Sequence, residues 1–233
     1  LQTDPHFPST AAPAPGPFED TYRGLAGEPE AVVAIHLSAQ YSGIFNAARL
    51  GAEAVADTLT VVPVDSGQIS LAMGLMAMVA AEAARGGASL AEILYLLEDL
   101  KPRTHLLAVL NTLDNLRRSG RVNQLVARMG DFLRIKPVLH VHQGEILLPE
   151  RVRSWGRAQH HLVQMVRSMA PFDRVVLAHI QRFEATEALG YALSDLLPPN
   201  TYTYEAGITI GAHIGAGAAG VALIRAHESG IRR

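Results

Sequence analysis

The 233-residue chain contains no cysteine. Disulfide bonds, thiolate metal ligands and cysteine nucleophiles are therefore excluded. An excess of positive charge is also lacking, because the formal net charge is -2 at pH 7 and no block of basic residues occurs. Nucleic-acid binding depends on such charge, so we expect no nucleic-acid partner.

Long apolar runs are absent as well. The longest run, residues 69–81, stops at Glu82 and is too short to span a bilayer, so no integral membrane segment is expected. The first residues, LQTDPHFPST, lack the basic and apolar parts of a signal peptide. We therefore expect a cytoplasmic protein.

Nucleotide-binding motifs are missing or out of context. No Walker A sequence occurs, which argues against phosphate transfer of the P-loop kind. Gly215, Gly217 and Gly220 spell G-x-G-x-x-G, but the strand-like residues VALI follow where a dinucleotide site requires a helix. We expect these glycines to allow close backbone approach to a ligand or to another domain.

The histidines form no H-E-x-x-H zinc motif. His140 and His142 lie on one predicted strand, and His160 and His161 are neighbours on a predicted helix. We expect neither pair to converge on one metal ion, and we predict no metal site and no cofactor.

One stretch combines a predicted strand, a turn and a predicted helix. A run with apolar residues at positions 32, 33, 35 and 37 gives way to Ser38, Ser42 and Gly43, and an alanine-rich helical run follows at residues 44–56. Ser42 occupies the position expected for a helix N-cap. The serine could only cap its own helix, or it could join the free amides of the helix start in binding a carboxylate or phosphate.

A second segment allows two interpretations. The predicted helix over residues 69–85 is rich in leucine and methionine. Such residues build an ordinary core helix, and because methionine adapts to irregular apolar space they would also suit the wall of a lipid tunnel.

The order of elements predicts an α/β protein with two domains. Strands and helices alternate up to residue 100, which favours a parallel sheet covered on both faces, a three-layer α/β/α arrangement. After Pro102 six strands follow with only three helices between them, which favours a six-stranded mixed sheet with helices on one face. We expect a parallel α/β domain over residues 1–103 and a mixed-sheet α/β domain over residues 104–233. The six strands are predicted at residues 105–110, 137–141, 145–151, 174–180, 201–206 and 218–224.

Six short motifs occur in an order that resembles the DegV family of bacterial fatty-acid-binding proteins. In the first half they are Thr10 with Pro13, Pro15 and Phe18; Ser38, Ser42, Gly43 and Ala48; and Asp65 with Ser66. In the second half they are Leu113, Leu116, Gly120 and Arg121; Ile135, Lys136 and Pro137; and Gly211, His213, Gly215, Gly217 and Gly220.

The resemblance implies a function and a set of site residues. Family members enclose one long-chain fatty acid such as palmitate in an apolar tunnel, and many present its carboxylate to a separate fatty-acid kinase that forms an acyl phosphate. By this resemblance Thr10 and Ser42 hydrogen-bond the carboxylate, Gly43 supplies a backbone amide, and His213 lies close to the head group. The chain itself is then not expected to be an enzyme.

The sequence departs from the family pattern at several positions. Family chains begin with a further strand some tens of residues before Thr10, so the parallel sheet is expected to lack its N-terminal strand. Alanine or another residue replaces the usual family residue at Ala11, Ala14, Ile44, Ser119 and Ala216.

Two other classes of function remain open from the residues alone. Ser42, His213 and Asp65 could form the triad of a serine-type hydrolase acting on lipid esters, although Gln40 stands where the nucleophile elbow G-x-S-x-G requires its first glycine. The chain could also be a plain interaction module without a lipid.

Overall fold

The computed structural model describes residues 8–120 and 135–227. Arg121, the last residue of one family motif, lies outside them. The described residues form two compact units. The first unit contains residues 10–102 with 143–145, and the second contains residues 103–120, 135–142 and 146–227 with residues 8 and 9.

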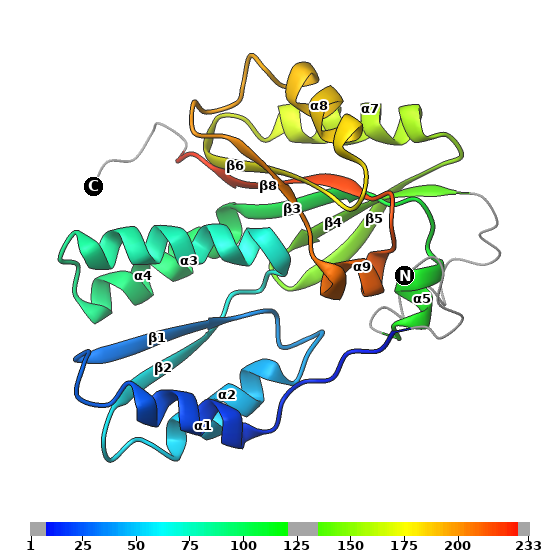
Figure 1. The fold of residues 1–233 in the computed structure, drawn as a ribbon. Coiled ribbons are helices and arrows are strands. Elements are labelled where there is room, and N and C mark those ends of the chain that lie inside the picture. Colours follow the sequence, from blue (N-terminus) through cyan, green and yellow to red (C-terminus); the bar gives the residue numbers. More distant parts are fainter. Residues whose placement is uncertain (1–7, 121–134, 228–233) are drawn as a thin grey trace. The chain divides into compact units, whose positions relative to one another are not determined.

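The first unit is built on two parallel strands. Strand β1 (Ala31–His36) pairs with β2 (Thr60–Asp65), and Ala31 lies opposite Thr60 at one end while His36 lies opposite Asp65 at the other. Within this unit, Figure 1 shows two helices on each side of the strand pair. They are α1 (Pro15–Gly24) and α2 (Ile44–Glu53) on one side, and α3 (Ser70–Arg85) and α4 (Leu90–Leu100) on the other.

Close packing joins α1 to α2. A Cβ atom on Gly51 would lie 2.7 Å from the Cβ of Phe18, so only glycine allows the two helices to approach this closely. Tyr22, Ala52 and Val55 are buried behind this contact. The segment before α1 is thereby held along the start of α2.

The expected helix ends are largely confirmed in this unit. Ser89 and Glu92 form the capping box that their spacing predicts at the start of α4. Helix α2 ends at Glu53 instead of continuing to residue 56, because the following residues form a series of turns.

The second unit is built on a six-stranded sheet with the order β5-β4-β3-β8-β6-β7. Strand β3 is antiparallel to β4 and β8, whereas β6 and β7 are parallel, so the sheet is mixed. The six predicted strands and the α/β fold class are confirmed. The strands are β3 (Thr104–Val109), β4 (Lys136–His142), β5 (Glu145–Val152), β6 (Phe172–His179), β7 (Tyr202–Glu205) and β8 (Ala219–Arg225).

Helices α7 (Trp155–Ser168) and α8 (Phe183–Ala192) cover one face of this sheet and share its core. Two short helices, α5 (Asp114–Arg118) and α9 (Ile208–Ile214), pack on each other, and η1 (Lys101–Arg103) leads into β3. The sequence does not predict helix α9, because its seven residues include one glycine and lie between two more. Glycine disfavours a helix.

The last glycine of the motif near the C-terminal end has a structural role in the sheet. Gly220 lies within strand β8, so a strand stands where a dinucleotide site requires a helix, as predicted. A Cβ at this position would lie 2.2 Å from the carbonyl oxygen of Leu107 on the neighbouring strand β3. The glycine therefore permits β3 and β8 to pair.

Among residues 8–120 and 135–227, no helix is both long enough and apolar enough to cross a bilayer.

Candidate functional site

The turn between β1 and α2 carries the first candidate residues. Gly43 is the N-cap of α2, so the prediction that Ser42 is the N-cap was wrong by one residue. Ser42 nevertheless satisfies the helix start, because its Oγ accepts a hydrogen bond of 3.2 Å from the N–H of Ile44. Accepting this bond uses a lone pair and leaves the hydroxyl proton available as a donor.

The same turn also offers backbone donors. The first N–H groups of an α-helix have no partner within the helix, and they carry the positive end of its dipole. In α2 the first intrahelical bond runs from the N–H of Ala47 to the carbonyl oxygen of Gly43. The start of α2 therefore combines a partly buried hydroxyl with backbone amides, which is a chemistry suited to an anion.

The turn after β2 holds this arrangement in place. One carboxylate oxygen of Asp65 accepts from the N–H of Ala39 at 3.2 Å, and the other accepts from the N–H of Gly67 at 2.9 Å. The N–H of Ser66 donates to the carbonyl oxygen of His36 at 3.0 Å. These bonds fix the two loops to each other and give Asp65 a positioning role.

Buried Ser38 adds to the same framework. Its residue is 1% exposed, and its N–H donates to the carbonyl oxygen of Gln68 at 2.9 Å. Its Oγ accepts from the N–H of Gln40 at 3.4 Å. Because these contacts lie within the loops, Ser38 shapes the turn.

The segment that carries Thr10 reaches the start of α2. A Cβ on Gly43 would lie 3.6 Å from the Cβ of Ala12, so residues next to Thr10 pass the N-cap. Thr10 is partly buried and two residues from Ala12, a separation of at most about 7 Å along the chain. The structure thus brings the Thr10 segment and the Ser42 turn to one region of the first unit.

His213 belongs to the second unit. It lies in the last turn of α9 and is partly buried. The chain turns directly after this helix at Gly215, whose φ of +80° and close contact with Asn115 require glycine. The proximity of His213 to a bound head group stays a prediction.

A surface depression of about 490 Å³ lies at the other end of the strand pair, where β1 and β2 begin. Its lining includes three carboxylate side chains, those of Glu28, Glu30 and Asp57. Negative charge of this density would repel a carboxylate ligand. The depression is therefore a poor candidate for the anion site.

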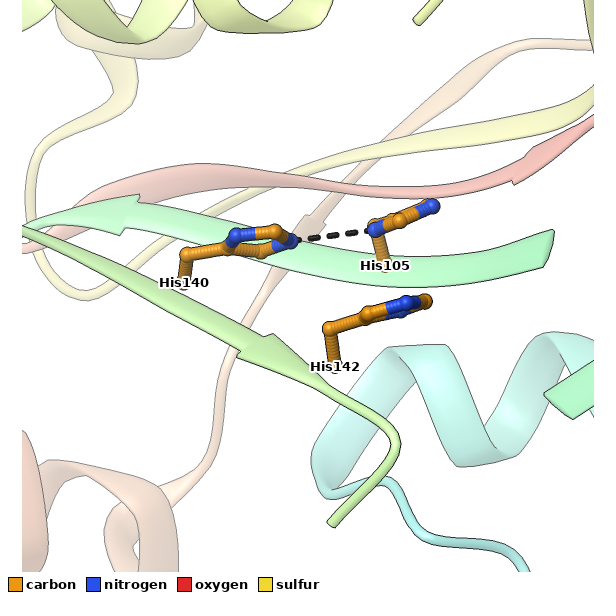
Figure 2. A group of neighbouring side chains, drawn as sticks. All are labelled: His105, His140 and His142. Atoms are coloured by element: carbon orange, nitrogen blue, oxygen red, sulfur yellow. Dashed lines mark hydrogen bonds between the residues drawn. The ribbon is translucent and has the colours of Figure 1, made fainter. Parts of the chain in front are cut away.

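A cluster of three histidines is not predicted by the sequence. His140 and His142 do face one region, contrary to the prediction, because residues two apart on a strand share a face of the sheet. His105 of β3 joins them, and one ring nitrogen from each of the three lies within 4.8 Å of the others (Figure 2). The pattern H-x-H on a predicted strand indicates two histidines on one face of the sheet.

Comparison with known protein sequences places the chain in a family. A family model described as "Uncharacterised protein, DegV family" matches residues 1–226. A DegV domain-containing protein of Deinococcus radiodurans is 36% identical over 221 residues, which are 93% of this chain and 78% of that protein. The protein DegV of Bacillus subtilis is 32% identical over 220 residues, which are 92% of this chain and 78% of that protein.

Solved structures agree with the sequence comparison. A DegV family protein from Thermus thermophilus, described by its fatty acid binding, superimposes with a TM-score of 0.84 at 29% identity, over 95% of this chain and 80% of that one. DegV from Bacillus subtilis, described as a fatty acid binding protein, superimposes with a TM-score of 0.82 at 29% identity, over 94% of this chain and 79% of that one. The chain therefore belongs to the DegV family.

Proposed function

We propose that this protein binds one long-chain fatty acid, such as palmitate, and holds the carboxylate of that fatty acid at the start of α2. The observation that carries the proposal is the hydroxyl of Ser42 at a helix N-terminus, beside the segment of Thr10. The relatives from Thermus thermophilus and Bacillus subtilis, described as binding fatty acids, support the same ligand.

The head group determines how the ligand is oriented. Removing a carboxylate from water without replacing its hydration by donors costs more than the roughly 2–7 kcal/mol of a neutral amide or hydroxyl. The Ser42 hydroxyl, the Thr10 hydroxyl and the Gly43 amide would supply charge-assisted hydrogen bonds without a buried cation. His213 is proposed as a further neighbour of the head group.

The hydrocarbon tail supplies most of the affinity. About fourteen methylene groups at roughly 0.8 kcal/mol each give an upper figure of about 11 kcal/mol before ordering costs. Such a tail requires an apolar tunnel, and α3 offers partly buried apolar side chains for its wall, among them Leu71 and Met73. The rest of α3 is core, since Leu75 and Met76 are buried.

Holding the carboxylate at a fixed mouth would present it to a partner enzyme. We propose a fatty-acid kinase as that partner, with the chain acting as a cytoplasmic carrier that needs no cofactor and performs no catalysis. We also propose that the protein divides into two domains at residue 103.

Native mass spectrometry of the purified full chain, followed by lipid extraction, tests this function. We expect an adduct with the mass of one long-chain fatty acid, which disappears on denaturation and is recovered in the extract. Protein that carries no lipid and does not retain added labelled palmitate would contradict the proposal and favour the interaction module.

A further inference from the structure

Three histidines of the second unit meet on one face of its sheet. Leu107 of β3 lies opposite His140 of β4, and continuing this antiparallel register places His105 opposite His142. The rings of His105 and His142 stack with centroids 4.1 Å apart at 11°, and the ring of His140 lies 5.2 Å from that of His105 (Figure 2). This three-histidine cluster, His105 with His140 and His142, includes none of the residues proposed to hold a fatty acid.

The hydrogen bonds of the cluster leave nitrogen lone pairs unused. Nδ1 of His142 lies 3.2 Å from the carbonyl oxygen of Thr104, and because a carbonyl only accepts, Nδ1 must carry the proton. In the neutral ring the other nitrogen of His142, Nε2, then carries a lone pair and no proton. A backbone carbonyl that fixes the tautomer in this way is the usual outer partner of a metal-binding histidine.

His105 is the most deeply buried ring of the cluster, and its Nδ1 faces His140 while its Nε2 lies at the far end of the ring (Figure 2). The residue is 6% exposed, and its Nδ1 lies 3.0 Å from Nε2 of His140, so these two nitrogens share one proton. Its Nε2 is buried and has no hydrogen-bond partner among the residues that the structure describes. Whichever nitrogen carries the proton, His105 keeps one buried nitrogen unsatisfied, which is costly in a protein interior.

The surroundings of the cluster also affect its electrostatics. Burial, followed by the neighbouring histidines, lowers the pKa of His105 to about 3 and that of His140 to about 4. Arg225 is the charged group that acts against a cation here, since its positive charge contributes to the lowered pKa of His105.

We propose that His105, His140 and His142 bind a divalent zinc ion. Three imidazole ligands suit zinc and its first-row neighbours, whereas magnesium and calcium prefer oxygen ligands. Zn–N bonds of about 2.0–2.1 Å place ligand nitrogens roughly 3.3 Å apart, so the cluster must contract from its spread of up to 4.8 Å. Rotation of the partly buried rings of His140 and His142 can supply this movement.

Such a site would keep a fourth position for water or another ligand, as three-histidine zinc sites do. It would also link β3 to β4 and stabilise the second unit by an amount that rises with the logarithm of the zinc concentration above the dissociation constant. The positive charge of Arg225 leads us to expect an affinity below that of a three-histidine site without a neighbouring cation.

Titration of the chelator-treated full chain with zinc chloride tests the site. By calorimetry we expect one zinc ion per chain and a melting temperature that rises with zinc concentration. His142→Gln and His140→Gln should each weaken binding at least tenfold, on the order of one ligand's contribution, and remove the rise in melting temperature. The matched control is His160→Gln, because His160 is an exposed histidine on α7 and should leave both readouts unchanged.

Cobalt(II) gives a second readout that does not depend on stability. Bound cobalt should produce the visible absorption of a tetrahedral ion in the wild type and in His160→Gln, and this absorption should be lost in His142→Gln. Binding that is equal in the wild type and both cluster variants would overturn the proposal. So would the absence of binding at zinc concentrations up to about 1 mM.

Discussion

The turn between β1 and α2 and the three-histidine cluster present opposite chemistry. At the turn, the Ser42 hydroxyl and the amides of α2 are hydrogen-bond donors at the positive end of a helix. In the cluster, one ring nitrogen from each of three histidines lies within 4.8 Å of the others, and nitrogen atoms of this kind are metal ligands. The first region is therefore suited to an anion and the second to a cation. Each region can be tested with a ligand that should not bind to the other.

The largest effect on stability is expected from a substitution that disturbs the sheet carrying the histidines. Gly220→Ala places a Cβ 2.2 Å from the carbonyl oxygen of Leu107, so β3 and β8 must separate. We expect a loss of more than about 3 kcal/mol in the free energy of unfolding. Urea denaturation measures this loss.

Gly156→Ala is the control for that experiment. This glycine lies in the first turn of α7 with no atom within 4 Å of a Cβ, so alanine should be neutral or stabilise by up to about 1 kcal/mol. Equal unfolding midpoints for Gly220→Ala and the wild type would contradict the packing that places His105 beside its neighbours.

The pH dependence of stability separates the two regions further. The folded-state pKa values of His105 and His140, about 3 and about 4, lie below the usual value of 6.5, so the unfolded chain binds more protons at intermediate pH. Stability should be full above about pH 6.5 and fall as the pH is lowered toward about 4. Each histidine contributes at most about 1.4 kcal/mol per pH unit over that range.

His140→Gln should flatten this dependence, whereas Ser42→Ala should leave it unchanged. Chemical denaturation at a series of pH values in the presence of a chelator measures both slopes. An unchanged slope in His140→Gln would show that the ring of His140 is not held neutral by its surroundings.

Asp65→Asn tests whether the two loops of the first unit depend on each other. The amide side chain retains one acceptor oxygen, so one of the hydrogen bonds from the Ala39 and Gly67 amides is lost. We expect palmitate affinity to fall by about fivefold to tenfold, which corresponds to a loss of about 1–1.4 kcal/mol. Fluorescent fatty-acid displacement measures the affinity, with Asp57→Asn as a control on the distant depression.

The smallest expected effect is the coupling between Thr10 and Ser42. If both hydroxyls donate to one carboxylate, the loss in Thr10→Ala and Ser42→Ala together should differ from the sum of the single losses by about 0.5–1 kcal/mol. Palmitate affinities of the four proteins give this coupling. Strict additivity would argue that the two hydroxyls serve different groups.

The sequence predicted elements whose signal lies within a short segment. Apolar runs predict the six strands of the second unit, and the residue types of Gln143 and Gly144 favour a hairpin turn between two of them. Both turn residues adopt positive φ. The capping box at Ser89 was found for the same reason, because its partners are three residues apart.

Features that depend on pairing between distant segments were missed. His105 and His140 are 35 positions apart and meet only because β3 and β4 pair in one register. The role of Asp65 likewise depends on contacts to the loop after β1, which no local pattern reveals. Helix α9 was missed because tertiary packing against α5 stabilises a segment that has weak helix propensity.

The most direct test of the fatty-acid proposal compares two ligands that share one hydrocarbon tail and differ in whether the head group is charged. Ser42→Ala should weaken the binding of palmitate by about tenfold or more, because a charge-assisted hydrogen bond contributes about 1.5–3 kcal/mol. The binding of methyl palmitate should hardly change, since its neutral ester gains little from the start of α2. An equal loss for both ligands, or no loss for palmitate, would contradict a carboxylate held by Ser42.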